Sequence, residues 1–153
     1  MFRTIICSAA LVLATTEAMC ADWEPAPKIP NQPNFVAARY VHDDGGSLVV
    51  LCDTQEKLIR IMHIEPRANW TEGDTVNTTV MDDDGISTTS KYGQALNRRA
   101  VIIMNESTFD LIRMGQAKRF FTVSIGNYAR IYPTANFKRI TGPVLQACGD
   151  RWD

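Results

Sequence analysis

Short runs of β-branched and aromatic residues, separated by turn residues, dominate the chain from residue 35 onward. Such runs predict strands rather than helices. Residues 74–81 show the pattern well, because Thr75, Asn77 and Thr79 occupy one face and Val76, Thr78 and Val80 the other, as in a half-buried strand. The predicted strands are residues 35–41, 47–53, 58–64, 74–81, 86–92, 98–104 and 118–125, with residues 129–132 extending the last strand or following it as another.

Turn chemistry separates several of these runs. Residues 43–46 read Asp-Asp-Gly-Gly and residues 82–85 read Asp-Asp-Asp-Gly. Glycine tolerates positive φ and aspartate caps turns, so both segments predict tight turns between strands. The polar residues 54–57 separate two apolar runs and predict a further hairpin.

Two segments change to a helical period. Residues 107–110 have a capping-box pattern at the start of a short apolar helix that Gly115 can end. Residues 137–147 are apolar at helical spacing, with a glycine-proline pair at 142–143. This segment forms either one kinked helix or two parts, the second beginning at Pro143.

The first residues have the layout of a secretory signal peptide. A basic start precedes an apolar run over residues 4–14, which is too short to span a bilayer, and small residues follow. We expect cleavage after Ala21, giving a signal peptide of residues 1–21, with Ala18 or Cys20 as alternative last residues. No later apolar run is long enough to span a bilayer, so we expect a protein that is not membrane-embedded.

The rest of the chain divides into two parts. Residues 22–34 contain four prolines and predict an extended lead-in rather than a packed element. Residues 35–153 predict a single β-rich domain. Seven to eight antiparallel strands with two short helices favour a mainly β fold, a single β-sandwich or small barrel.

The charge balance excludes two classes of partner. The chain has 16 basic and 17 acidic residues. Removal of Arg3 and Glu17 with the leader leaves 15 and 16, so the net charge stays at −1. Nucleic acids and anionic membranes attract a basic excess, so we expect neither as a partner.

Four cysteines are encoded, and two of them lie in the predicted leader. Cleavage leaves Cys52 and Cys148, which predicts a single disulfide in an oxidising compartment. A reactive or metal-binding thiol pair is disfavoured, because Cys52 lies in an apolar strand without a Cys-x-x-Cys partner. The expected location is therefore periplasmic or secreted.

The order of motifs resembles a bacterial family. An apolar strand ends in Cys52-Asp53, an alternating strand ends in Asp-Asp-Gly, and a Leu-Ile helix, a Phe-Phe-Thr-Val strand and a terminal Leu-Gln-Ala-Cys148 follow. This order is similar to that of the VasI-like periplasmic proteins associated with type VI secretion. The invasion-associated locus B proteins are similar in size and export. The resemblance implies a β-sandwich whose inner-strand cysteine pairs with the C-terminal one, and it brings no catalytic residues.

Metal and catalytic signatures are weak. His42 and His63 lack a recognisable zinc spacing. Ile86, directly after the 82–85 turn, stands where a calcium loop needs an oxygen ligand. We therefore read this segment as a turn, with a weak surface metal site as the alternative. No serine has a Gly-x-Ser-x-Gly setting, and a triad would have to use one of the two histidines. We therefore expect no catalytic residue, metal or cofactor.

Charged pairs and tryptophans are the candidate binding residues. An exposed tryptophan can anchor a protein partner, but in a small domain it also covers the core. Basic pairs at strand starts can form a cationic patch, but they also discourage edge pairing. The candidate partner-binding residues are Asp82, Asp83, Asp84, Arg98, Arg99 and Trp70, and Lys118, Arg119, Arg130, Lys138 and Arg139 add basic charge nearby.

Three asparagines, Asn69, Asn77 and Asn105, lie in Asn-x-Ser/Thr triplets. In a eukaryotic secretory route they would be candidate glycan sites, whereas in a bacterium the triplets carry no such meaning. The family resemblance favours the bacterium.

These features predict a non-enzymatic exported protein that binds an envelope or secretion-system protein. One alternative is an inhibitor of an envelope-attacking hydrolase such as lysozyme, which would insert the acidic 82–85 loop into a catalytic cleft. A second alternative is a cell-wall or glycan hydrolase that uses His42, His63 or a turn aspartate. The sequence leaves the oligomeric state open.

Overall fold

The computed structural model describes residues 21–28, 33–103 and 107–152. The predicted signal peptide before Ala21 and the triplet asparagine Asn105 lie outside the described residues. So does the side chain of Ser107, which begins the predicted capping box.

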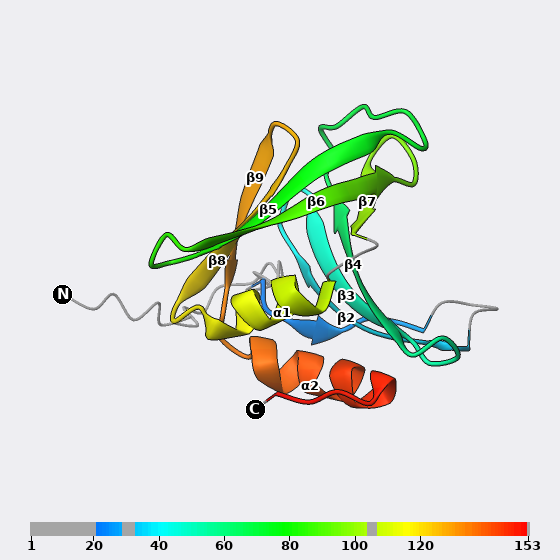
Figure 1. Cartoon of the computed structure of the whole chain (residues 1–153), viewed down its shortest axis with the longest axis vertical. Coiled ribbons are helices and arrows are strands. Elements are labelled where there is room, and N and C mark those ends of the chain that lie inside the picture. The colour runs from blue at the N-terminus through cyan, green and yellow to red at the C-terminus, as the bar shows by residue number, and fades with distance from the viewer. Residues whose placement is uncertain (1–20, 29–32, 104–106, 153) are drawn as a thin grey trace, which may run out of the picture.

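Nine antiparallel strands form one sheet, in the order β1-β2-β3-β4-β7-β6-β5-β8-β9 (Figure 1). Neighbouring strands in this order pair in continuous register over most of their length, with a shift between Val76 and Thr78 where β5 meets β6. The strands are β1 (Glu24–Pro25), β2 (Phe35–Val41), β3 (Ser47–Asp53), β4 (Leu58–Ile64), β5 (Thr75–Asp82), β6 (Ser87–Ala95), β7 (Ala100–Ile103), β8 (Phe120–Ile125) and β9 (Tyr128–Pro133). The mainly β fold is confirmed.

The strand count differs from seven to eight because the proline-rich lead-in contributes β1. Pro25 lies opposite Ala38 on β2, in an edge strand, where a residue without an N–H is tolerated. The side chain before this strand, Trp23, is only 3% exposed. This part of the lead-in is therefore packed, because an indole at its start has a place in the core.

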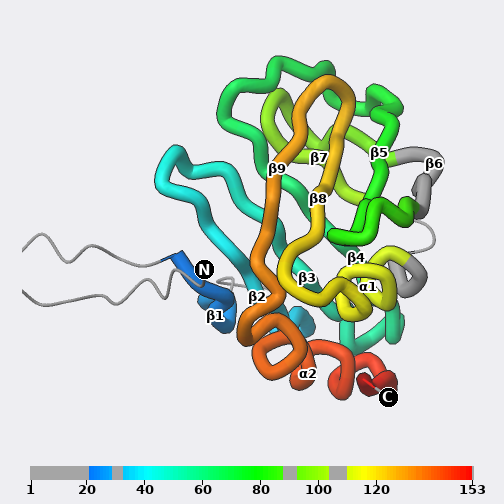
Figure 2. Tube along the Cα trace, turned by 90° about the vertical axis from the view of Figure 1, so that its left-hand side faces the viewer, coloured from blue at the N-terminus to red at the C-terminus, as the bar shows by residue number. Residues whose placement is uncertain are grey.

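Two helices lie at one end of the sheet, α1 (Ser107–Gln116) and α2 (Phe137–Cys148) (Figure 2). α2 contains Pro143 within its length, so the 137–147 segment is one helix rather than two parts. It ends at Gly149, whose φ of 88° suits glycine and whose N–H donates to the carbonyl of Gln146.

The sheet curls around a core formed by its inward-facing side chains (Figure 1). In the described residues β1 and β9 are the outermost strands and do not pair with each other. Side chains connect them instead. The Trp23 indole nitrogen donates to the carbonyl oxygen of Pro133 at 2.8 Å, and its rings pack against Tyr40, Phe121 and Phe137.

A disulfide joins Cys52 in β3 to Cys148 at the end of α2, with the two Cα atoms 5.7 Å apart. The predicted disulfide is confirmed. It fixes α2 against the central strands, and it indicates folding in an oxidising compartment. Within the described ranges, neither helix has the length and apolar character needed to cross a membrane.

Candidate functional site

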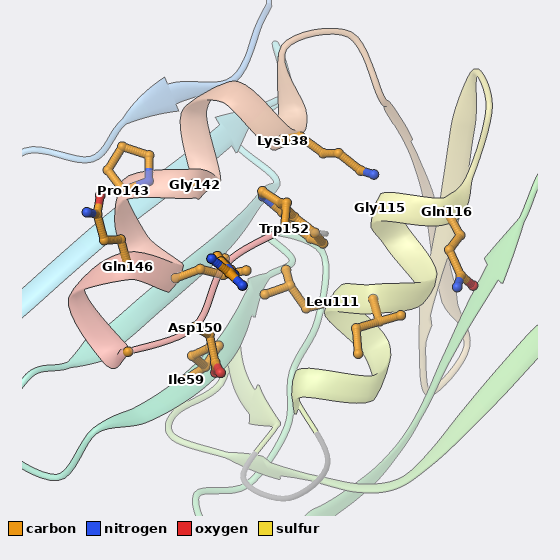
Figure 3. A pocket seen from close by; sticks show the side chains of 14 residues that line it. Ile59, Leu111, Gly115, Gln116, Lys138, Gly142, Pro143, Gln146, Asp150 and Trp152 are labelled. Carbon is orange, nitrogen blue, oxygen red and sulfur yellow. The ribbon is translucent and has the colours of Figure 1, made fainter.

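A groove of about 1040 Å³ lies between α1 and α2 (Figure 3). We call it the helix groove. Its walls come from α1, α2 and the chain after α2, and Ile59 of β4 also lines it. The volume lies at the upper end of the range of ligand pockets.

Trp152 lies between the two helices in this groove (Figure 3). Its indole nitrogen donates to the Thr141 hydroxyl oxygen at 3.2 Å, and its rings pack against Phe137 at 5.6 Å. Gly115 on α1 allows the close approach, because a Cβ there would lie 2.5 Å from a Trp152 ring carbon. The tryptophan is therefore held by both helices and forms part of a preformed wall.

The groove combines an apolar lining with charged groups. Leu111 is buried, whereas Ile112 keeps 45% of its surface exposed. The Lys138 ammonium lies 5.5 Å from the centre of a Trp152 ring, a cation–π contact that leaves its charge at the groove. Arg151 and Asp150 also line it, so the lining carries one more positive than negative charge.

The acidic turn 82–85 is occupied by contacts within the protein. Asp83 accepts hydrogen bonds from the backbone N–H groups of Lys118 and Arg119 at 2.9 and 3.2 Å, and from the Arg119 Nε. These contacts, the Lys118 N–H first, lower the pKa of Asp83 below its ordinary value. The turn therefore lies against the start of β8.

The other members of this turn behave similarly. Asp82 accepts from the backbone N–H groups of Asp84 and Ile86 and pairs with Arg113 on α1 at 3.3 Å. Asp84 pairs with Lys118 at 2.8 Å. These carboxylates neutralise a basic pair of the same chain, so they supply little free charge to a partner.

Trp70, Arg98 and Arg99 come together at the end of the sheet that lies away from the two helices (Figure 1). The Trp70 backbone N–H donates to the Arg98 carbonyl at 3.0 Å, and the Glu65 N–H donates to the Arg99 carbonyl at 2.8 Å. Trp70 and Arg98 line one shallow hollow. Of the predicted partner-binding residues, these three form one group and the three aspartates another.

A buried ionic cluster, formed by Arg130, Glu65, Asp44 and Arg67, was not predicted. Arg130 on β9 is 8% exposed and Glu65 is fully buried. The guanidinium donates to Glu65 Oε2 at 2.7 Å and makes two contacts with Asp44, at 2.9 and 2.8 Å. Arg130 therefore belongs to the interior rather than to a cationic surface patch.

Each charge in the cluster shifts the pKa values of the others. Hydrogen bonds lower the pKa of Glu65 far below its ordinary value, with the larger effect from Arg67 and the smaller from Arg130. Burial acts in the opposite direction and does not offset them. The Arg130 guanidinium lowers the pKa of Asp44 to about 2. Gly46 makes room for this guanidinium, since a Cβ there would meet its carbon at 2.1 Å. The sequence signal that could have indicated this cluster was Arg130 itself, a charged residue in the middle of an otherwise largely apolar strand.

His42 and His63 pack against Tyr132 beside this cluster. His63 is 1% exposed, and its Nδ1 lies 3.3 Å from the Tyr132 hydroxyl oxygen. Burial lowers the pKa of His63 to about 4, with Arg130 and His42 adding to the effect and Glu65 opposing it. Burial also lowers the pKa of His42. Across the described residues, no group of three or more metal-ligating side chains occurs.

We predict that acidification destabilises the protein from about pH 6.5 downward, before most carboxylates begin to titrate. Between pH 6.5, the ordinary pKa of histidine, and pH 4, the unfolded state takes up a proton that folded His63 does not. The free energy of unfolding should therefore fall with falling pH, by up to about 3 kcal/mol over that window.

Urea unfolding at pH 7.5 and pH 5 measures this loss. In His63→Gln, which lacks this titrating group, the difference between the two pH values should become clearly smaller, and the remainder belongs to His42. An equal pH dependence in wild type and variant would contradict the assignment to His63.

No family model, curated protein or solved structure matches the chain. The proposals below therefore rest on the sequence and on the geometry described above.

Proposed function

We propose that the protein is a non-enzymatic exported binding protein that holds a segment of another envelope or secretion-system protein in the helix groove. The observation that supports this proposal is the groove itself. Its apolar wall, Ile112, Leu111 and Trp152, can take up an apolar anchor side chain, and the positive excess at Lys138 and Arg151 favours a neighbouring carboxylate.

Export is part of the same proposal. The disulfide indicates an oxidising compartment, and the predicted signal peptide supplies the route. Similarity to the VasI-like group stays a prediction from short motifs. It agrees with a partner in the bacterial envelope.

The two alternatives have less support in the geometry. An inhibitory loop would need free charge, and the carboxylates of the 82–85 turn interact with Lys118, Arg119 and Arg113. A hydrolase would need an accessible acid and base. His63 is buried and His42 packs against Tyr132. The turn aspartates pair with basic residues of the same chain, so the predicted acid–base candidates are engaged within the fold.

Site-specific photo-crosslinking tests the proposal. A photoreactive residue at Gln116 or Gln146, both exposed on the groove, should crosslink in intact cells to one envelope protein that mass spectrometry identifies. The same residue at Ile131, which is 59% exposed on β9 and outside the groove, is the control.

The identified partner is then measured against purified variants. Ile112→Glu should weaken its affinity about tenfold or more, because the substitution places a carboxylate against an apolar anchor. Ile131→Glu changes an isoleucine that is still more exposed and should leave the affinity unchanged. Equal effects of the two variants, or lysozyme inhibition without an envelope partner, would contradict the proposal.

A further inference from the structure

A second surface lies at the end of the sheet opposite the two helices. Three connections meet there: the β4–β5 loop, the β6–β7 turn and the β8–β9 turn (Figure 1). The Trp70 backbone bond to Arg98 joins the first two connections. The Gly126 N–H donates to the Asn77 carbonyl at 2.8 Å, which fixes the third against β5.

Trp70 is held rigidly on this surface while part of it stays exposed. Its rings stand at 90° to the Tyr128 ring, with centres 5.9 Å apart. Tyr128 is fixed in turn, because its hydroxyl donates to the Arg67 carbonyl at 3.1 Å and the Arg67 guanidinium lies over its ring. A rigid aromatic side chain loses little entropy when a ligand packs on it.

Three shallow hollows follow one another across this surface, and we call them together the Trp70 surface. The first, of about 400 Å³, has Trp70 as one wall and Asp74, Asn77 and Asn127 around it. The second, of about 370 Å³, shares Trp70 and adds Asn69, Glu72, Asn97 and Arg98. The third, of about 550 Å³, shares Glu72 and adds Gln94 and Leu96. Consecutive hollows with shared walls fit a ligand made of repeating units.

The side chains in these hollows match the chemistry of sugars. Carboxylates and amides offer planar acceptors and donors, which pair well with vicinal hydroxyl groups. An aromatic face packs against the C–H groups of a pyranose ring. Gly126 borders the first hollow, and its φ of +57° lies in the left-handed region that favours glycine.

An extended peptide fits the Trp70 surface less well. Peptide recognition uses an open strand edge or deep apolar pockets for side chains. Here the hollows lie on loops and the adjoining strand ends, they are shallow, and amide, carboxylate and hydroxyl side chains line them beside apolar ones. We propose that the Trp70 surface binds a linear oligosaccharide, with successive pyranose rings on either side of Trp70.

NMR titration of the ¹⁵N-labelled, disulfide-bonded protein tests this inference. Cellotetraose and chitotetraose are the probes, and the Trp70 indole N–H is the reporter. We expect at least one tetrasaccharide to shift this signal and those of Asn77 and Asn127. Trp70→Ala should weaken the affinity roughly tenfold, whereas Trp70→Phe, which keeps an aromatic face, should retain most of it.

Asn127→Ala is a second variant that does not touch the packing of Trp70. Asn127 is exposed in the β8–β9 turn, so the protein should stay folded while the affinity falls several-fold. Lys138→Glu, at the helix groove, should leave oligosaccharide binding unchanged. This control separates the inference from the proposed protein partner.

The inference would be overturned if neither tetrasaccharide shifted the Trp70 signal at roughly 10 mM. It would also be overturned if Trp70→Ala bound with the same affinity as wild type, or if a polar tetrapeptide produced equal shifts. Failure of this test leaves the helix groove proposal standing, because the two surfaces lie at opposite ends of the sheet (Figure 2).

Discussion

Arg130→Met should lower the free energy of unfolding by about 3–5 kcal/mol, measured by urea denaturation at pH 7. The Arg130 side chain is 7% exposed and contacts both Glu65 and Asp44. Its removal leaves the fully buried Glu65 carboxylate with Arg67 as its remaining guanidinium partner, and the Arg67 side chain is 60% exposed. A buried charge that loses its buried partner is costly, because the remaining partner is mostly in solvent and water cannot replace the lost contact.

Arg39→Met is the matched control. It breaks the ion pair between Arg39 on β2 and Glu24 on β1, whose side chains are 37% and 46% exposed. An exposed pair contributes about 1 kcal/mol or less. If Arg130→Met destabilised the protein no more than Arg39→Met, the buried ionic cluster would not stabilise the fold.

A double variant separates the cost of leaving Glu65 without its buried partner from the loss of the arginine itself. Glu65→Gln combined with Arg130→Met removes both charges of the buried pair. We expect the double variant to be more stable than Arg130→Met alone, since no buried charge remains. Additive losses would show that the two side chains act independently.

Loss of the disulfide should have an effect of similar size. Cys52 and Cys148 are separated by 96 residues, and closing a loop of that length removes about 4–5 kcal/mol of unfolded-chain entropy. That is a large fraction of the 5–15 kcal/mol typical of a folded domain. The Cys52→Ala, Cys148→Ala variant should therefore unfold at a much lower urea concentration than wild type.

Chemical reduction provides the control for this prediction. Dithiothreitol should destabilise wild type by nearly as much as the double substitution, and it should leave the double variant unchanged. Wild type that stays within 1 kcal/mol of its oxidised stability after reduction would contradict the prediction. Thiol labelling after unfolding verifies the redox state in each case.

The strands could be predicted from the sequence because their signal is local. Alternation with a period of two and Asp-Gly turns depend on neighbouring residues, and β2, β3 and β4 have the predicted bounds. The weakest local signal was β1, which is two residues long and contains a proline. It pairs because Trp23 is drawn into the core, and no local pattern reports that.

The sites were harder to predict because their residues are distant in sequence. Glu65 and Arg130 are 65 positions apart, and Asp44 and Arg130 are 86 apart. A sequence scan reads each as a surface charge, although a buried charge needs a partner that only the curled sheet supplies. Trp152 likewise reads as a terminal tryptophan until both helices are in place around it.

By itself the sequence determined the mainly β class, the two helical segments and the partners in the disulfide, because period, turn chemistry and cysteine count act locally or by elimination. The tertiary structure decided that the aspartates of the 82–85 turn bind their own chain and that Trp70 joins Arg98. It also placed Arg130 between Glu65 and Asp44. The physical reason is that charged and aromatic side chains contact partners that are distant in sequence, and the curvature of the sheet brings those partners together.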